Sequence, residues 1–407
     1  MSISLLVASS DEAFRESIRE NLLNIANARV IAEYPDISTN LYIRVLQDLE
    51  RNPDAALILD ISGDMESGRK ALEKVKQASP DLYVMVADYS TDGESVISAV
   101  RAGANDFFVL PLRRTDFRDA ITRLEHVPRR AAASESRLGK VYTFIGTKGG
   151  VGTTSLAVNF ASVLAQRKSN TVLIDLDWVG NDVAMQLGAQ PQYTLVEVGE
   201  NITRMDQALF EGFVTRDPLG FFLVGPPDSL EVPQAYFTEP LFREFATFLV
   251  DKYESIVIDA GRHINDDLIL GALQVSSSIF VVVTQEFPAV RNAQRYISYL
   301  MRMGFNQDQI KVVVNRYTKK PSAQYASLEQ IQQTLNQPIF YGIPDSPSVL
   351  ASINRSRPLV SERQSFAEMD KVIRSFVDKA IGTKKSAAGA ENGSKRNAEK
   401  QKSAMGT

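Results

Sequence analysis

The sequence has 407 residues, 44% of them hydrophobic and 23% charged, which is typical of a soluble protein of two or three domains. It has no cysteine and two histidines, His126 and His263, which excludes disulfide scaffolds, thiol catalysis, cysteine-ligated metals and multi-histidine metal centres. The net charge of −4 includes a basic C-terminal tail, so the rest of the chain is acidic and gives no strong DNA-binding signal.

Residues 1–125 alternate short apolar runs with helical patterns. The apolar runs are SLLVA, ARVIAEY, AALILDI, LYVMVAD and DFFVLPL. Five such βα units predict a small doubly wound parallel sheet. The chain start has no basic region before an apolar run, and no stretch of 18 apolar residues occurs anywhere. We therefore expect a cytoplasmic protein without a signal peptide or a membrane span.

Residues 126–140 are small, charged and aperiodic, which predicts a linker. A second βα series follows over residues 141–381, with the apolar runs VYTFIG, TVLIDLD, FFLVGP, SIVIDA, SIFVVVT and IKVVVNR. Its last segment, FAEMDKVIRSFVDKAIG, has helical amphipathic spacing. We expect this helix to pack on the sheet, with a membrane anchor as the alternative. Residues 382–407 carry six basic and two acidic side chains and almost no apolar ones, which predicts a disordered basic tail.

A glycine-rich loop follows the first strand of the second series. VYTFIG leads through a loop with four glycines into the apolar helix TTSLAVNFASVLA. Glycines allow successive backbone amides to approach phosphate oxygens, and a helix N-terminus attracts anions. The sequence therefore predicts a phosphate-binding loop. The nucleotide-binding residues that we expect in it are Lys148, Gly149, Gly150, Val151, Gly152, Thr153, Thr154 and Ser155.

This loop resembles the deviant Walker A motif of the ParA/MinD superfamily of ATPases, roughly GxKGGxGK[ST]. The resemblance rests on Lys148, on the pair Gly149 and Gly150, and on Thr154, which stands where the family has a magnesium-ligating hydroxyl. The family's second lysine is Thr153 in this chain. Because that lysine neutralises the β- and γ-phosphates, the resemblance implies ATP and Mg²⁺ binding with weak hydrolysis or none.

Acidic residues follow two of the predicted strands. Asp175 and Asp177 end TVLIDLD, where strand alternation places both side chains on the same side, and Asp259 ends SIVID. By the resemblance, Asp175 and Asp259 serve the magnesium ion, and Asp177 positions the attacking water as the catalytic residue.

The resemblance extends from Val141 to Ile381. It implies that Asn315 contacts the adenine ring and that Pro344 and Asp345 line the base. Superfamily members bind ATP as a sandwich dimer in which the early lysine crosses to the partner's phosphates. The resemblance therefore implies an ATP-linked homodimer with Lys148 in the crossing role.

The first domain resembles a two-component receiver, with Asp60 at the phosphoacceptor position. Ser9 and Ser10 stand where the acidic pair should be, Ala87 replaces the hydroxyl residue, and Leu110 replaces the lysine. Phosphoryl transfer to an aspartate needs Mg²⁺ and a balancing cation. We therefore expect a pseudo-receiver that acts as a docking or dimerisation surface, with Asp60 a degenerate phosphoacceptor.

A degenerate receiver joined to a ParA/MinD-like domain resembles the CpaE/TadZ family of Flp (Tad) pilus assembly. The resemblance implies a receiver-like (flavodoxin-like) sheet followed by a P-loop α/β domain. It also implies an ATP-binding localisation scaffold with the pilus secretion machinery as partner, at a cell pole or at the cytoplasmic face of the inner membrane, with peripheral membrane contact. The alternatives are an active ParA-type partition ATPase, a MinD-like membrane-cycling ATPase and a phosphorylated response regulator.

Overall fold

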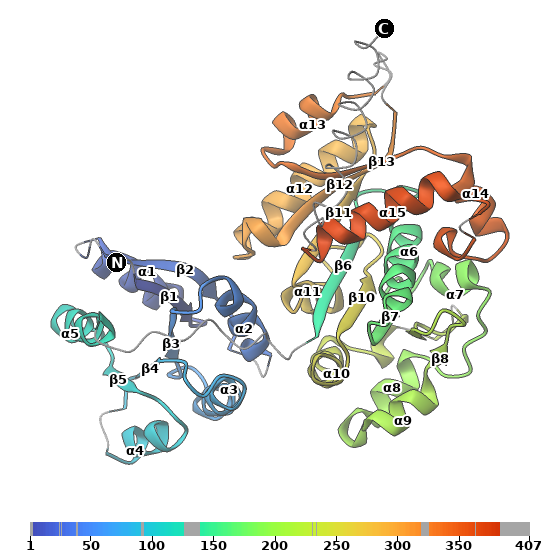
Figure 1. The fold of residues 1–407 in the computed structure, drawn as a ribbon. Coiled ribbons are helices and arrows are strands. Elements are labelled where there is room, and N and C mark those ends of the chain that lie inside the picture. Colours follow the sequence, from blue (N-terminus) through green and yellow to red (C-terminus); the bar gives the residue numbers. More distant parts are fainter. Residues whose placement is uncertain are drawn as a thin grey trace, which may run out of the picture.

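The computed structural model describes residues 3–23, 25, 27–37, 40–90, 93–125, 139–229, 231–232, 234–318, 325–362 and 364–382. They form two α/β domains, a first domain over residues 3–125 and a second over residues 139–382, each built on a mainly parallel sheet (Figure 1). The predicted linker and tail fall mostly on residues 126–138 and 383–407, outside the described residues. Both stay predictions.

The first domain is a five-stranded parallel sheet in the order β2-β1-β3-β4-β5. Its side chains alternate between two cores, since Leu5 and Val7 pack with α1 and α5 while Leu6 and Ala8 pack on the opposite face. The predicted doubly wound sheet is confirmed. Its elements are β1 (Ile3–Ala8), α1 (Glu12–Leu22), β2 (Ala28–Tyr34), α2 (Leu41–Arg51), β3 (Ala56–Asp60), α3 (Met65–Ala78), β4 (Val84–Asp88), α4 (Gly93–Arg101), β5 (Asp106–Val109) and α5 (Arg114–Glu125).

The second domain is an eight-stranded sheet in the order β13-β12-β11-β6-β10-β7-β9-β8, parallel except for β8. Its central strands are buried along their whole length because helices cover both faces. The strands are β6 (Lys140–Gly146), β7 (Thr171–Asp175), β8 (Thr215–Arg216), β9 (Phe222–Val224), β10 (Ser255–Asp259), β11 (Ser278–Val283), β12 (Ile310–Tyr317) and β13 (Ile339–Pro344).

The helices of the second domain end with the amphipathic helix α15. Met369, Ile373 and Phe376 of α15 are buried in a core with Phe144 of β6 and Phe160 of α6, so the predicted packing against the sheet is confirmed. No helix among the described residues is both long and apolar enough to cross a bilayer. The helices are α6 (Thr153–Gln166), α7 (Asp182–Leu187), α8 (Leu195–Asn201), α9 (Gln207–Phe213), α10 (Glu239–Lys252), α11 (Asp267–Gln274), α12 (Phe287–Arg302), α13 (Leu328–Leu335), α14 (Pro347–Asn354) and α15 (Ala367–Ala380), with 3-10 turns η1 (Ile202–Arg204), η2 (Gln234–Tyr236), η3 (Gln307–Gln309) and η4 (Leu359–Ser361).

The first domain contacts the second through α2 (Figure 1). The side-chain amide of Gln47 donates to the carbonyl of Val275 at 2.9 Å and to the Ser277 hydroxyl at 3.3 Å. Ser277 itself pairs with Val141, at the start of β6. The first domain is therefore attached at the amino ends of the strands of the second sheet.

Polar and apolar contacts extend this interface along α10. Arg243 forms an ion pair with Asp36 at 2.6 Å, and the Thr247 hydroxyl donates to the side chain of Asn40. One continuous cluster of buried apolar side chains includes residues of α2 and of α11. Burial of apolar surface between the domains stabilises their relative placement.

Candidate functional site

The glycine-rich loop lies between the end of β6 and the start of α6. Gly150 and Gly152 have φ of +79° and +91°, the left-handed region that glycine adopts at low cost. A Cβ on Gly152 would also collide with the side-chain amide of Asn315. These two positions therefore require glycine.

The backbone of this loop presents unpaired donors. Within the described part of the chain, no backbone or side-chain acceptor receives a hydrogen bond from the amides of Lys148, Gly149 or Gly150. The loop leads directly into α6, a 14-residue helix whose N-terminus carries a positive partial charge. Unpaired amides at a helix start fit an anionic phosphate group.

Hydrogen bonds with β11, α12 and β12 hold the loop in place. The Thr147 hydroxyl donates to the Val282 carbonyl at 2.9 Å, and the Asn292 amide donates to the Thr147 carbonyl at 2.9 Å. Asn315 donates to the Val151 carbonyl at 2.7 Å. The loop is therefore preorganised before any ligand arrives. Asn315 supports the loop, and its contact with adenine stays a prediction.

The side chains of the loop differ in what they offer a phosphate. Lys148 forms an ion pair with Glu286, and both side chains remain about 40% exposed. Thr153 is buried, and its hydroxyl lies against Gly146, where a Cβ would collide with it. The Ser155 hydroxyl donates to Gln186 at 3.1 Å. Position 153 therefore brings neither a cation nor an outward-facing hydroxyl to the loop.

Two buried carboxylates lie next to each other beside the loop. Asp175 and Asp259 are direct neighbours on the paired strands β7 and β10 and are almost fully buried. Burial raises the pKa of Asp259 to about 6, which hydrogen bonding from Thr154 and from the Gly261 amide partly opposes. Burial, and then the charge of Asp259, raises the pKa of Asp175 well above its ordinary value.

These carboxylates fit a divalent cation. Asp259 Oδ1 accepts from the Gly261 amide at 3.2 Å, whereas its buried Oδ2 has no partner among the described residues. A cation there would satisfy this atom and would lower both pKa values. The described residues hold no cluster of three His, Asp or Glu side chains suited to a metal. Mg²⁺ would therefore take its remaining ligands from Thr154, water and phosphate oxygens, as it commonly does.

Asp177 lies beyond the strand that was expected to carry it. The expectation that Asp175 and Asp177 leave the same side of one strand is wrong, because β7 ends at Asp175. The Asp177 amide instead donates to Asp175 Oδ1 at 2.8 Å, and its carboxylate accepts from the Gly180 amide at 2.9 Å. Asp177 lines a hollow of about 400 Å³ together with Trp178 and His263. Its water-positioning role stays a prediction.

The residues predicted to line the base lie at the end of β13. Pro344 is the last residue of that strand, and the exposed Asp345 approaches Arg316 at 3.5 Å. The neighbouring strand β12 carries Asn315, which reaches the loop. Pro344 and Asp345 therefore share the carboxyl edge of the sheet with the loop, and their contact with a base stays a prediction.

Four residues that sequence reasoning missed belong to this site. Glu286 pairs with Lys148, Asn292 holds Thr147, Gln186 pairs with Ser155, and Arg262 lies beside Gly149. Two of them, Arg262 and Glu286, follow β10 and β11 at their carboxyl ends, where α/β sheets commonly bind ligands. That position is the signal that could have identified them.

The first domain presents a closed version of the phosphoacceptor site. The Ser9 hydroxyl donates to Asp60 Oδ2 at 2.6 Å, and the Ser62 amide donates to Asp60 Oδ1 at 3.0 Å. Asp60 is buried, and Leu110, which follows β5, is apolar and buried. Both carboxylate oxygens are thus already engaged, which supports a degenerate site.

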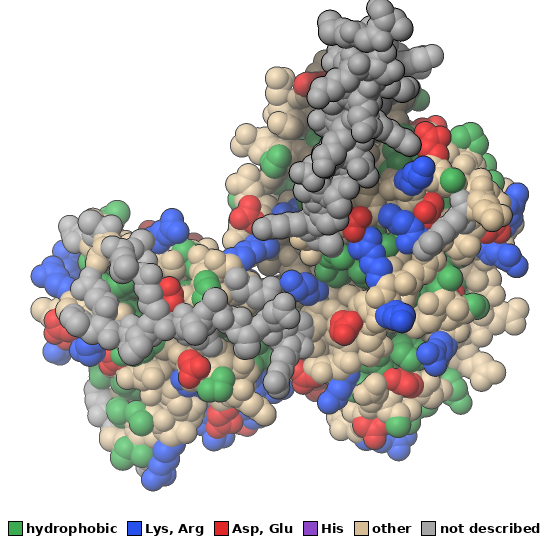
Figure 2. Space-filling model, in the orientation of Figure 1, with side chains coloured by type: hydrophobic (Ala, Val, Ile, Leu, Met, Phe, Trp, Pro, Cys, Tyr) green, Lys and Arg blue, Asp and Glu red, His purple; other side chains and the backbone are tan. Residues whose placement is uncertain are grey.

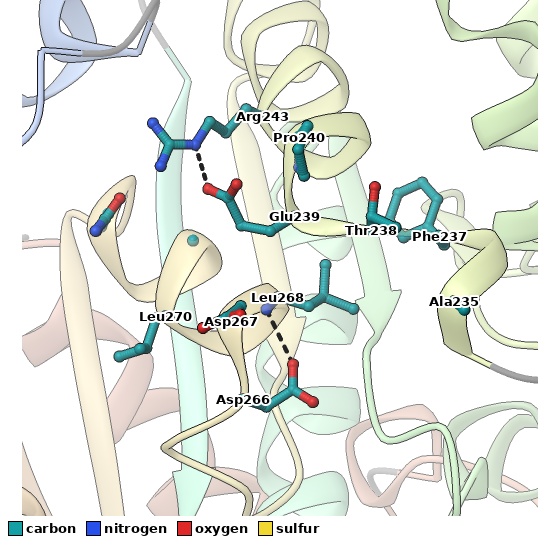
Figure 3. A pocket seen from close by; sticks show the side chains of 12 residues that line it. Ala235, Phe237, Thr238, Glu239, Pro240, Arg243, Asp266, Asp267, Leu268 and Leu270 are labelled. Atoms are coloured by element: carbon teal, nitrogen blue, oxygen red, sulfur yellow. Dashed lines mark hydrogen bonds and ion pairs between the residues drawn. The ribbon is translucent and has the colours of Figure 1, made fainter.

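A second hollow, of about 550 Å³, lies between α10 and α11 (Figure 3). Glu239 points toward Arg243, with which it forms an ion pair. Asp266 accepts from the Leu268 amide at 2.9 Å and caps α11. These polar side chains already stabilise α10, α11 and the contact between the domains. The glycine-rich loop, at the carboxyl end of β6, therefore remains the candidate site.

The second domain is similar to known nucleotide-binding proteins. The family model described as the CobQ/CobB/MinD/ParA nucleotide binding domain matches residues 142–359. A putative septum site-determining protein MinD of Guillardia theta is 30% identical over 230 residues, covering 56% of this chain and 82% of the relative. The structure of a ParA family ATPase from Chlorobium tepidum TLS has a TM-score of 0.54 at 20% identity. The match covers 60% of this chain and 99% of that chain. The structure of the septum site-determining protein MinD from Pyrococcus horikoshii OT3, complexed with Mg-ADP, has a TM-score of 0.51 at 17% identity. The match covers 60% of this chain and 96% of that chain.

Proposed function

The chain belongs to the CobQ/CobB/MinD/ParA nucleotide-binding family, and from that premise we propose that it is an ATP- and Mg²⁺-binding positioning scaffold that dimerises with ATP and hydrolyses it weakly or not at all. One observation carries this proposal. The loop has unpaired amides, and two carboxylates lie beside it. At position 153, however, where the family has a lysine, this chain has a buried threonine whose hydroxyl faces Gly146.

The residues that remain are suited to binding. The loop amides would hold the phosphates, and Asp175, Asp259 and Thr154 would hold the cation. Bound Mg²⁺ would neutralise part of the phosphate charge. Without a lysine at position 153, one positioned donor to the transition state is missing. Loss of a comparable donor costs roughly 10²- to 10³-fold in rate.

We further propose that the scaffold serves assembly of the Flp (Tad) pilus machinery. This finer role rests on the resemblance to the CpaE/TadZ family. It is supported by the pairing of a P-loop domain with a first domain in which Ser9 closes off Asp60. In this proposal the protein is a homodimer at a cell pole or at the cytoplasmic face of the inner membrane, and the first domain is the docking surface.

A cycling ATPase that positions other proteins is the second candidate. Its support is the similarity to septum site-determining proteins, together with the presence of Lys148 and Asp177. A DNA-partition role has less support. On the face shown in Figure 2, basic and acidic side chains are interspersed over the second domain and do not gather into a basic field.

Incubation of the full-length protein with labelled Mg-ATP tests the proposal, with bound nucleotide and product quantified in the same sample. We expect bound ATP with negligible ADP. Steady turnover would favour the cycling ATPase, and absence of bound nucleotide would contradict both candidates. The Thr153→Lys variant is the matched comparison. It should bind ATP and release more ADP than the unaltered chain.

A further inference from the structure

One cation of the site lies close to the glycine-rich loop without a side-chain partner among the described residues. Arg262 follows β10 by three residues, and a Cβ built on Gly149 would lie 3.2 Å from its Nη1 atom. Arg262 is exposed, and its guanidinium forms no ion pair or hydrogen bond with any residue that the structure describes. Lys148, by contrast, is paired with Glu286.

The backbone beside Arg262 is held on both sides. The Gly146 amide donates to the Gly261 carbonyl at 2.7 Å, and the Tyr296 hydroxyl donates to the Arg262 carbonyl at 2.6 Å. Gly261 has a φ of +56°, and a Cβ there would lie 2.8 Å from the Asp177 carboxyl carbon. These contacts tie the Arg262 turn to the end of β6, from which the loop starts.

We propose that Arg262 is a further phosphate-binding residue, which supplies from the same chain the positive charge that Thr153 does not bring. A guanidinium is a cation that binds phosphate oxygens with two parallel hydrogen bonds. It needs no release from a carboxylate before it binds, because no described residue pairs with it. This inference rests on the proposed ATP-binding function.

Isothermal titration calorimetry of the full-length protein with Mg-ATP measures the ATP affinity and tests the assignment. Arg262→Gln should weaken binding by about 10- to 150-fold, the range expected for loss of a hydrogen bond to a charged group. Arg262→Lys should recover part of this loss. The affinity of Arg262→Gln should also depend less on salt concentration than that of the unaltered chain, because one screened attraction is gone.

Arg302→Gln is the matched control. Arg302 is also exposed, but it lies in the last turn of α12, about 23 Å along the helix from the end beside the loop. The Arg302→Gln variant should bind ATP with an affinity within about twofold of that of the unaltered chain, because exposed charges that far apart are largely screened. Equal affinities for the unaltered chain and Arg262→Gln, or equal losses in Arg262→Gln and Arg302→Gln, would overturn the inference. Absence of ATP binding by the unaltered chain would instead reject the proposed function on which it rests.

Discussion

Replacement of Asp259 by asparagine should stabilise the ligand-free protein. Burial raises the pKa of Asp259 to about 6 from 3.8, so holding it ionised at neutral pH costs about 3 kcal/mol. Asparagine has the same shape, carries no charge and keeps the acceptor for the Gly261 amide. Its new NH₂ group lies beside Asp175 and needs an acceptor there. We therefore expect Asp259→Asn to raise the free energy of unfolding by about 1–3 kcal/mol.

The size of this gain should depend on pH. Because the pKa of Asp259 is higher in the folded than in the unfolded chain, the folded state binds more protons between about pH 4 and pH 6. The unaltered protein therefore gains stability as the pH falls through 6. The advantage of Asp259→Asn should be largest above pH 6 and should shrink steadily below it.

Thermal unfolding over a range of pH in EDTA, and in separate samples with Mg-ATP and no EDTA, measures both effects. For a domain of this size, 1 kcal/mol corresponds to about 2–4 °C in Tm. Asp259→Asn should unfold at a higher temperature than the unaltered chain in EDTA, and should gain less from Mg-ATP. Asp345→Asn is the control, because Asp345 is exposed and its removal should leave Tm nearly unchanged. A lower Tm for Asp259→Asn in EDTA, or a difference that does not vary with pH, would refute the reasoning.

Three further predictions concern the dimer, the loop and the first domain. Lys148→Ala should abolish ATP-dependent dimerisation on size-exclusion chromatography. Normal dimerisation of Lys148→Ala would contradict the crossing role. Glu286→Gln should strengthen ATP-dependent dimerisation by about two- to fivefold, because the exposed ion pair that holds Lys148 contributes at most about 1 kcal/mol. Gly152→Ala should lower the free energy of unfolding by about 1–2 kcal/mol and weaken ATP binding at least tenfold. Gly93→Ala is the control, because open space surrounds Gly93, and it should change neither quantity. Thermal unfolding measures the stability, and calorimetry measures the ATP affinity. Acetyl phosphate should not label Asp60, whose oxygens are already engaged, and phosphate detected on Asp60 by mass spectrometry would restore the response-regulator alternative.

Local sequence patterns predicted most of the fold and the position of the glycine-rich loop. AALILDI and SIVIDA became the buried strands β3 and β10, because apolar runs between helical patterns must be covered on both faces. The glycine spacing likewise predicted the loop before α6, since it reflects backbone geometry that glycine allows.

What the sequence could not predict depends on strand order. Lys148 and Glu286 are 138 residues apart and meet only because β6 and β11 are neighbours in the sheet. Arg262 comes close to Gly149 in the same way, across β6 and β10. The alternation rule also failed for Asp177, because it holds only while the strand continues and β7 ends at Asp175.

The attachment of the first domain at the amino end of β6 determines what a dimer can present to other molecules. The phosphate loop starts at the opposite end of this seven-residue strand, about 20 Å away. Two chains that meet through their loops would carry their first domains on the outer sides of the pair, one at each end. A partner with two binding motifs would then engage both at once and gain affinity through effective concentration. ATP would thus convert a monovalent protein into a bivalent one without any change within the first domain.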